Sequence, residues 1–174
     1  MGTVEPGEPE DPTEGGRWIV VDGRRWRATD PTIPDALRSE LVNALMAARR
    51  AVGAARRNAD EAAEKSARSQ VNDAKVALGE RGEPWWKPPS DEGLRHRARA
   101  TVRTLIEGRA PDGTICPSDV ARTIGGSTWR PLMPMIRSEV RDLALRNLVE
   151  VRQGGTAVDP HQEWTGPIRI GRPA

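Results

Sequence analysis

A short run of proline and tryptophan, PWWKPP, occupies residues 84–89 of the 174-residue sequence. Proline fixes its own φ angle and pushes the preceding residue toward extended backbone, so no regular helix can cross this run. The helical patterns on its two sides therefore belong to different elements. We expect a linker at residues 84–90, a module at residues 17–83 and a second domain at residues 91–174.

The first sixteen residues carry five acidic side chains, no basic one and few groups large enough to bury. Such a segment cannot offset the entropy cost of ordering, and we predict a disordered acidic tail at residues 1–16. The start of the sequence lacks the basic and apolar regions of a signal peptide, and no run of 18 apolar residues predicts a membrane helix. The single cysteine, Cys116, cannot form an internal disulfide. These features favour a cytoplasmic protein.

A β-hairpin is predicted directly after the tail. Two β-prone runs in RWIVVDGRRWR flank Asp22-Gly23, a dipeptide favoured by the two-residue type I′ turn. We expect Trp18 and Trp26 to pair across its strands. A lone hairpin is marginal in water and must pack on another element.

Two helical patterns follow the hairpin. Thr32 is the expected cap of the first helix, and the segment from Asn58 to Glu61 offers the cap of the second. Apolar residues recur with the helical period in both, although the second stripe is thin and rich in alanine. The stripes comprise Leu37, Leu41, Leu45, Ala48, Val52 and Ala55, then Ala63, Ala67, Val71, Ala74 and Leu78. We predict an antiparallel helical hairpin, which is also a candidate for self-association or a protein partner.

After the linker, the predicted order is helix, strand, helix, tight turn, helix and β-hairpin. Ser90 caps the first helix, Ser118 caps the second, and the third begins at Ser127 or Thr128. Glycines at 154 and 155 form the hairpin turn. This is the order of a winged helix-turn-helix domain. The predicted fold class is mainly α (α+β): a winged helix-turn-helix domain preceded by a β-hairpin and a helical hairpin.

The C-terminal part is basic. Residues 94–174 hold 13 basic and 8 acidic side chains, a net charge of +5, and 24 of the 27 basic residues of the chain are arginine. Arginine binds phosphate with two hydrogen bonds, so the charge favours a polyanionic partner. A GC-rich genome explains the same composition equally well.

The third helix carries the main candidate nucleic-acid site. At 100° per residue, Arg130, Arg137 and Arg141 share one face of the helix. Ser138 lies near that face and has a small side chain. In a helix-turn-helix this helix enters the major groove, where arginine reads guanine. The alternative is a solvated face whose arginines pair with nearby acids.

Further basic residues extend the candidate site. Arg95, Arg99 and Arg103 recur every four residues on the first helix of the domain, where they would follow phosphates. The alternative is that acids such as Glu107, or the other domain, neutralise them. Arg152 lies beside the predicted wing tip, and a terminal basic arm would hold Arg169 and Arg172.

Patterns of enzymatic chemistry are absent from the sequence. His96 and His161 lie far apart without further ligands at metal spacing, and no phosphate-loop, GxGxxG, HExxH or GxSxG motif occurs. Cys116 fits a small core residue. We predict a protein that is not an enzyme and has no cofactor or metal.

Several short motifs occur in order in the second half: TICPSDVARTIGG, WRPLMPMIR, EVRQGGTAVDP and GPIRI. Over about residues 92–172 the sequence resembles an uncharacterised bacterial domain family of winged-helix type. The resemblance implies that fold but no activity, substrate or catalytic residue. The front half, from RWIVVDGRRWRATDPTIP onward, resembles an uncharacterised actinobacterial helical-hairpin module.

These predictions leave two hypotheses about function. In the first, the C-terminal domain binds double-stranded DNA through its third helix and wing. In the second, the winged helix is only a scaffold, and the chain is an adaptor for protein–protein contacts. Neither involves a membrane.

Overall fold

The computed structural model describes residue 11 and residues 13–173. Most of the predicted disordered tail, residues 1–10 and residue 12, lies outside the described residues. The described remainder of that segment forms a turn. Its Asp11 carboxylate accepts hydrogen bonds from the backbone N–H groups of Thr13 and Gly15, both at 2.9 Å.

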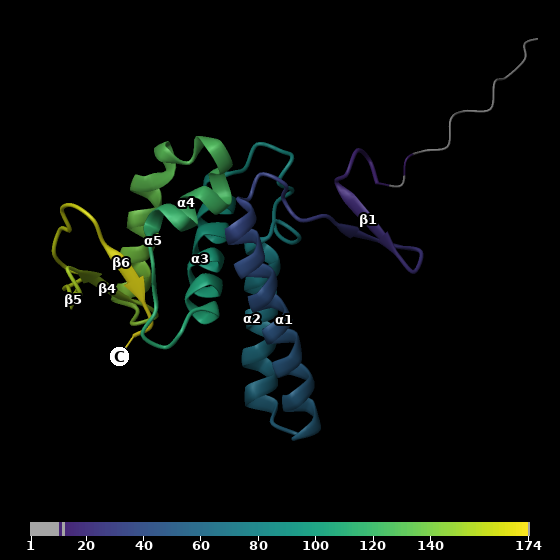
Figure 1. Cartoon of the computed structure of the whole chain (residues 1–174), viewed down its shortest axis with the longest axis horizontal. Helices are drawn as coiled ribbons and strands as arrows, with labels where there is room; N and C mark the ends of the chain where they lie inside the picture. The colour runs from purple at the N-terminus through teal and green to yellow at the C-terminus, as the bar shows by residue number, and fades with distance from the viewer. Residues whose placement is uncertain (1–10, 12, 174) are drawn as a thin grey trace, which may run out of the picture.

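The described residues form an α+β fold with an N-terminal β-hairpin followed by helices, which confirms this part of the predicted fold class. The helices are α1 (Asp35–Arg57), α2 (Glu61–Ala77), α3 (Asp91–Gly108), α4 (Pro117–Gly125) and α5 (Met133–Leu145), with 3₁₀ turns at Gly126–Thr128 and Arg130–Leu132. The strands are β1 (Trp18–Val21), β2 (Arg24–Arg27), β3 (Thr114–Ile115), β4 (Glu150–Gln153), β5 (Thr156–Ala157) and β6 (Arg169–Gly171). Figure 1 shows the paired helices α1 and α2 between the β1–β2 hairpin and the C-terminal elements.

The N-terminal hairpin turns at Asp22 and Gly23, whose φ angles of 50° and 72° are both positive, as a type I′ turn requires. The expected pairing of Trp18 with Trp26 is wrong. The two-residue turn places Trp18 opposite Arg27 and Ile19 opposite Trp26. Because neighbouring residues of a strand point to opposite faces, the two tryptophans lie on different faces of the hairpin.

Helices α1 and α2 form the predicted antiparallel pair. Five of the six predicted stripe residues of α1 are buried, with Leu41 fully buried, and Val52 is partly buried. In α2 the predicted stripe residue Ala63, which lies in the first turn, is exposed. Thr32 is not the cap of α1, because Pro34 occupies that position and the Thr32 hydroxyl donates instead to Asp30 at 2.7 Å. Asp60 caps α2 by accepting from Ala63 N at 2.9 Å.

Helix α3 begins at its predicted cap, Ser90, whose hydroxyl accepts from Gly93 N at 3.0 Å. The other two helices begin elsewhere than predicted. Helix α4 begins at Pro117, one residue before Ser118, and α5 begins only at Met133. Two prolines explain the late start of α5: Pro131 lies in the preceding 3₁₀ turn, and Pro134 is tolerated only in the first turn of an α-helix.

The C-terminal strands form an antiparallel sheet in the order β3-β6-β4-β5. Strand β6 pairs Ile170 with Ile115 of β3 and with Val151 of β4. The terminal segment is therefore not a free basic arm. Arg169 lies in β6, one of the two inner strands, and Arg172 donates to the carbonyl oxygens of Glu107 and Arg109, both at 3.1 Å.

The hydrophobic core is continuous across the linker. Leu37, Leu41 and Leu45 of α1 belong to the same buried cluster as Val102 of α3 and Ile136 of α5. The parts of the chain before and after residues 84–90 thus share one core.

Candidate functional site

The predicted arginine face of α5 is occupied by the chain itself. Arg137 donates to the carbonyl oxygens of Trp164 at 2.6 Å and Gly166 at 3.2 Å. Arg141 donates to Gln162 O at 3.0 Å, and its guanidinium lies 4.8 Å from the centre of the Trp164 ring. Both side chains therefore hold the loop that precedes β6 against α5.

The arginine stripe of α3 is neutralised by acids. Arg95 and Arg99 donate to the two carboxylate oxygens of Glu139, at 2.6 and 2.8 Å. This carboxylate belongs to α5 and is only 2% exposed. The hydrogen bond to Glu139 raises the pKa of Arg95 above its usual value. Arg103 binds Asp73 of α2, so the stripe binds the two elements packed against α3.

The remaining predicted residues differ in their surroundings. Arg152 forms an ion pair with Glu150 on its own strand. Ser138 is exposed on α5. Arg130 precedes α5 and is exposed, with its guanidinium 5.0 Å from the centre of the Trp129 ring. Arg122 of α4, which was not among the predicted site residues, lies at the same distance from that ring.

A second candidate surface lies at the hairpin. Ile19, Val21 and Trp26 share one face of β1 and β2, and each remains about half exposed. This face borders a groove of about 600 Å³, which also has Arg49 of α1 and Lys75 of α2 in its lining. We call this the hairpin groove. Figure 1 shows the position of the hairpin beside the paired helices α1 and α2.

The charge of the hairpin groove is mainly positive. Arg24, Arg49 and Lys75 line it together with Asp22 and Glu80. The Lys75 ammonium lies 5.4 Å from the centre of the Trp26 ring and 3.9 Å from a Glu80 oxygen. Partial burial lowers the pKa of Lys75, although Glu80 opposes that shift. The groove thus combines an apolar wall with a cationic one.

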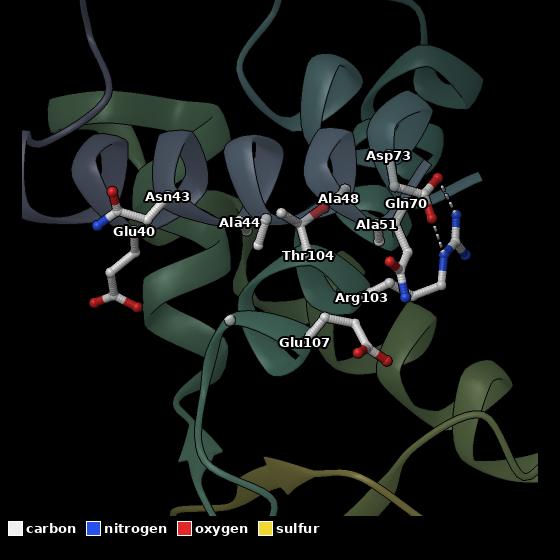
Figure 2. Close-up of a pocket in the computed structure, with 12 residues that line it drawn as sticks. Glu40, Asn43, Ala44, Ala48, Ala51, Gln70, Asp73, Arg103, Thr104 and Glu107 are labelled. Carbon is white, nitrogen blue, oxygen red and sulfur yellow. Dashed lines mark hydrogen bonds and ion pairs between the residues drawn. The ribbon is translucent and has the colours of Figure 1, made fainter. Parts of the chain in front are cut away.

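A pocket of about 400 Å³ lies between α1, α2 and α3. In Figure 2 its polar side chains surround a floor of small residues, with Ala44 and Thr104 at the centre and the Asp73–Arg103 pair at one end. Each charged group of the lining has a partner: Arg103 pairs with Asp73, Glu40 with Arg109 outside the lining, and Glu107 with Arg172 at 3.8 Å. This balance offers no strong preference for an ion of either sign.

Within the part of the chain that the structure describes, no group of three or more His, Cys, Asp or Glu side chains is placed to hold a metal ion. None of the described helices has the length and apolar character needed to cross a bilayer.

The part of the sequence that forms α3 to β6 matches a known family over most of its length. The model of the family described as "Protein of unknown function (DUF3253)" matches residues 95–173. These residues are a DUF3253 domain. The predicted membership of an uncharacterised domain family is therefore confirmed for this half of the chain. The search of curated proteins found no match.

Ion pairs join the DUF3253 domain to the N-terminal half. Besides Asp73–Arg103, Arg97 donates to Asp30 at 2.8 Å, and Arg109 donates to Glu40 at 2.9 and 3.0 Å. Of these three arginines, only Arg103 was a candidate for phosphate binding, and all three hold the two parts of the fold together. A helical spacing of cations identified the stripe, but only the long-range contacts identify its partners.

Proposed function

We propose that the chain is a non-enzymatic adaptor whose hairpin groove binds a segment of another protein. The DUF3253 domain serves in this proposal as a winged-helix scaffold. Its order of helices and strands, with β6 between β3 and β4, supports the winged-helix assignment. The observation that carries the adaptor role is the half-exposed apolar face of Ile19, Val21 and Trp26.

The side chains that line the groove indicate which kind of protein segment it would bind. Contiguous exposed apolar surface is characteristic of protein-binding sites, and an open strand edge accepts an extended segment through backbone hydrogen bonds. Opposite the apolar face, Arg49 and Lys75 favour carboxylates. The partner segment is therefore extended, with apolar side chains toward the hairpin and acidic side chains toward the helices.

The Glu14 side chain already shows that the hairpin accepts a carboxylate. It accepts hydrogen bonds from Arg25 at 2.6 Å and from the Trp18 indole at 3.1 Å. These two partners lie on the face opposite the hairpin groove, since Trp18 and Arg25 alternate with Ile19 and Trp26. Both faces of the hairpin thus combine aromatic and cationic groups.

A selection from a random peptide library tests the adaptor role. We expect the enriched peptides to alternate apolar and acidic residues. They should not bind variants of this chain that carry Trp26→Thr or Lys75→Glu. Leu145→Thr and Arg50→Glu are matched controls, because they change exposed residues outside the groove and should leave binding intact. Peptides without acidic residues, or equal binding to all four variants, would refute the proposal.

Binding of double-stranded DNA is the second candidate. It is favoured by the winged-helix order of elements and by the exposed pair Arg122 and Arg130 beside Trp129. The test is the fluorescence anisotropy of a short mixed-sequence duplex at two salt concentrations. A DNA-binding protein would give an affinity that falls steeply with salt and is lost in the double variant Arg122→Glu/Arg130→Glu, but not in Arg50→Glu. We expect little binding, because Arg137 and Arg141 are held by the chain itself.

A further inference from the structure

A separate pocket of about 390 Å³ lies where the linker, α3 and the turn after α4 meet. We call it the junction pocket. Its apolar lining includes Trp85 of the linker, Leu94 of α3, Ile124 of α4 and Leu132 of the following 3₁₀ turn. A volume of this size, lined by apolar groups together with polar and charged ones, is in the range of small-molecule sites.

The aromatic wall is held in place. The Trp85 indole N–H donates to the Ala28 carbonyl oxygen at 3.0 Å, and its ring meets Trp86 edge-to-face with 5.1 Å between centres. At Gly79, an added Cβ would come within 3.1 Å of the Trp85 ring, so glycine allows the close approach. The wall thus needs little reordering when a ligand binds, which favours affinity.

Arg97 supplies a largely buried cation to the pocket lining, with its side chain 15% exposed. Its Nη2 donates to Asp30 at 2.8 Å, and both Nε and Nη2 donate to Ala77 O at 3.2 Å. Among the described residues, its Nη1 has no hydrogen-bond partner. Burial lowers the pKa of Arg97, and the Asp30 carboxylate opposes that effect. The unused N–H donors of a guanidinium suit a carboxylate.

The other charges of the pocket also favour an anion. Arg81 and Lys87 line it without an acidic partner among the described residues. Its two carboxylates are already satisfied: Asp30 accepts from Thr32 and Arg97, and Glu83 accepts from the Ser90 hydroxyl and N–H. The cations therefore have donors left to offer, whereas the acids have few vacant acceptor sites.

We propose that the junction pocket binds a small organic acid, with an aromatic or branched apolar group against Trp85, Leu94 and Leu132 and its carboxylate toward Arg97 and the rim cations. This site is distinct from the hairpin groove and does not rest on the proposed adaptor role. Its lining includes Gly125–Thr128, the turn that joins α4 to α5. A bound acid would therefore join the linker to that turn.

The probe for this site is 4-(trifluoromethyl)phenylacetate, followed by ¹⁹F NMR in a titration with the full chain. The matched neutral probe is 4-(trifluoromethyl)phenylacetamide, which has nearly the same shape and no charge. We expect the acid to bind about tenfold more tightly than the amide, because charge-assisted hydrogen bonds to guanidinium are lost in the amide. Equal affinities, or no binding of the acid, would overturn the proposal.

Two variants locate the bound probe. Ser127→Trp places a large side chain at the exposed rim of the pocket and should abolish binding, whereas Ser39→Trp adds the same side chain on exposed α1 outside the pocket and should not. Lys87→Gln should weaken binding of the acid several-fold and leave the amide unchanged. Nuclear Overhauser contacts between the probe and the Trp85 ring provide an independent check in the unaltered chain. Binding that survives Ser127→Trp, or contacts that are absent from Trp85, would place the probe elsewhere and refute the site.

Discussion

Asp73 of α2 and Arg103 of α3 form a two-point ion pair, with 2.7 Å between Oδ2 and Nε and 2.9 Å between Oδ1 and Nη2. The Asp73 side chain is only 12% exposed, and that of Arg103 is 35% exposed. The pair links two helices that the linker separates in sequence. The sequence left two roles open for Arg103, contact with DNA phosphates or neutralisation by acids or the other domain, and its guanidinium joins the two halves of the fold.

A double-mutant cycle on this pair should show coupling. We expect Asp73→Ala and Arg103→Ala each to lower the free energy of unfolding by about 1–3 kcal/mol, because each leaves its partner without hydrogen bonds. The double variant should lose less than the sum, with a coupling energy of about 0.5–3 kcal/mol. Urea denaturation measures the free energy of unfolding of the two single variants and the double variant. Arg50→Ala on the exposed face of α1 is the control. Additive losses would contradict a direct interaction.

The continuous core predicts a single unfolding transition. Leu41 of α1 is fully buried and belongs to one cluster with Ile136 of α5. Leu41→Ala should cost about 2–5 kcal/mol through lost apolar contacts and the cavity it leaves. Circular dichroism and tryptophan fluorescence should give the same lowered midpoint for the whole chain. Leu145→Ala, at a position 45% exposed, should have a small effect. Two separate transitions would contradict a shared core.

Local patterns predicted the elements that local interactions determine. Ser90 was identified as a cap, and the α1 stripe as buried, because a cap bonds within three residues and a helical stripe repeats every three or four. The late start of α5 could also have been read from the sequence. Pro131 and Pro134 mark this late start, whereas Ser127 and Thr128, the predicted caps, belong to the 3₁₀ turn after α4.

Contacts between distant residues were the part that the sequence could not predict. Strand β6 has only three residues and is stabilised by partners on both sides, one of them as far away as Ile115. The partners of Arg95 and Arg137 lie 44 and 27 positions away, respectively. No helical spacing identifies such partners, so a row of cations has the same pattern whether it faces DNA or a buried carboxylate.

Acid should remove the contribution of Glu83 to stability. Hydrogen bonds from the Ser90 hydroxyl and N–H hold the pKa of Glu83 below its ordinary value of 4.5. A carboxylate whose folded pKa is depressed stabilises the fold above its unfolded pKa, and this stability is lost as the pH falls through the folded pKa. The difference in melting temperature between the unaltered chain and Glu83→Gln should therefore be largest near neutral pH and should decrease below the unfolded pKa of 4.5.

The control for the Glu83 experiment is Glu163→Gln. Glu163 is exposed and makes no side-chain hydrogen bond within the described residues. Melting curves recorded from neutral to acidic pH should show little difference between this variant and the unaltered chain at any pH. A difference for Glu83→Gln that stays constant across this range would show that the Ser90 contact does not depend on the charge of Glu83.

Arg137 distinguishes a structural role from a DNA contact. Its two-point contact with the Trp164 and Gly166 carbonyl oxygens needs the arginine fork to hold the loop, whereas an arginine that served only to contact DNA would contribute little to the stability of the free chain. Arg137→Lys should therefore lower the free energy of unfolding by about 1 kcal/mol and shift the ¹⁹F resonance of 5-fluorotryptophan at position 164. Arg130→Lys, in the exposed turn before α5, should do neither. An unshifted resonance in Arg137→Lys would mean that the loop is held against α5 without this side chain, and that the guanidinium is free for another partner.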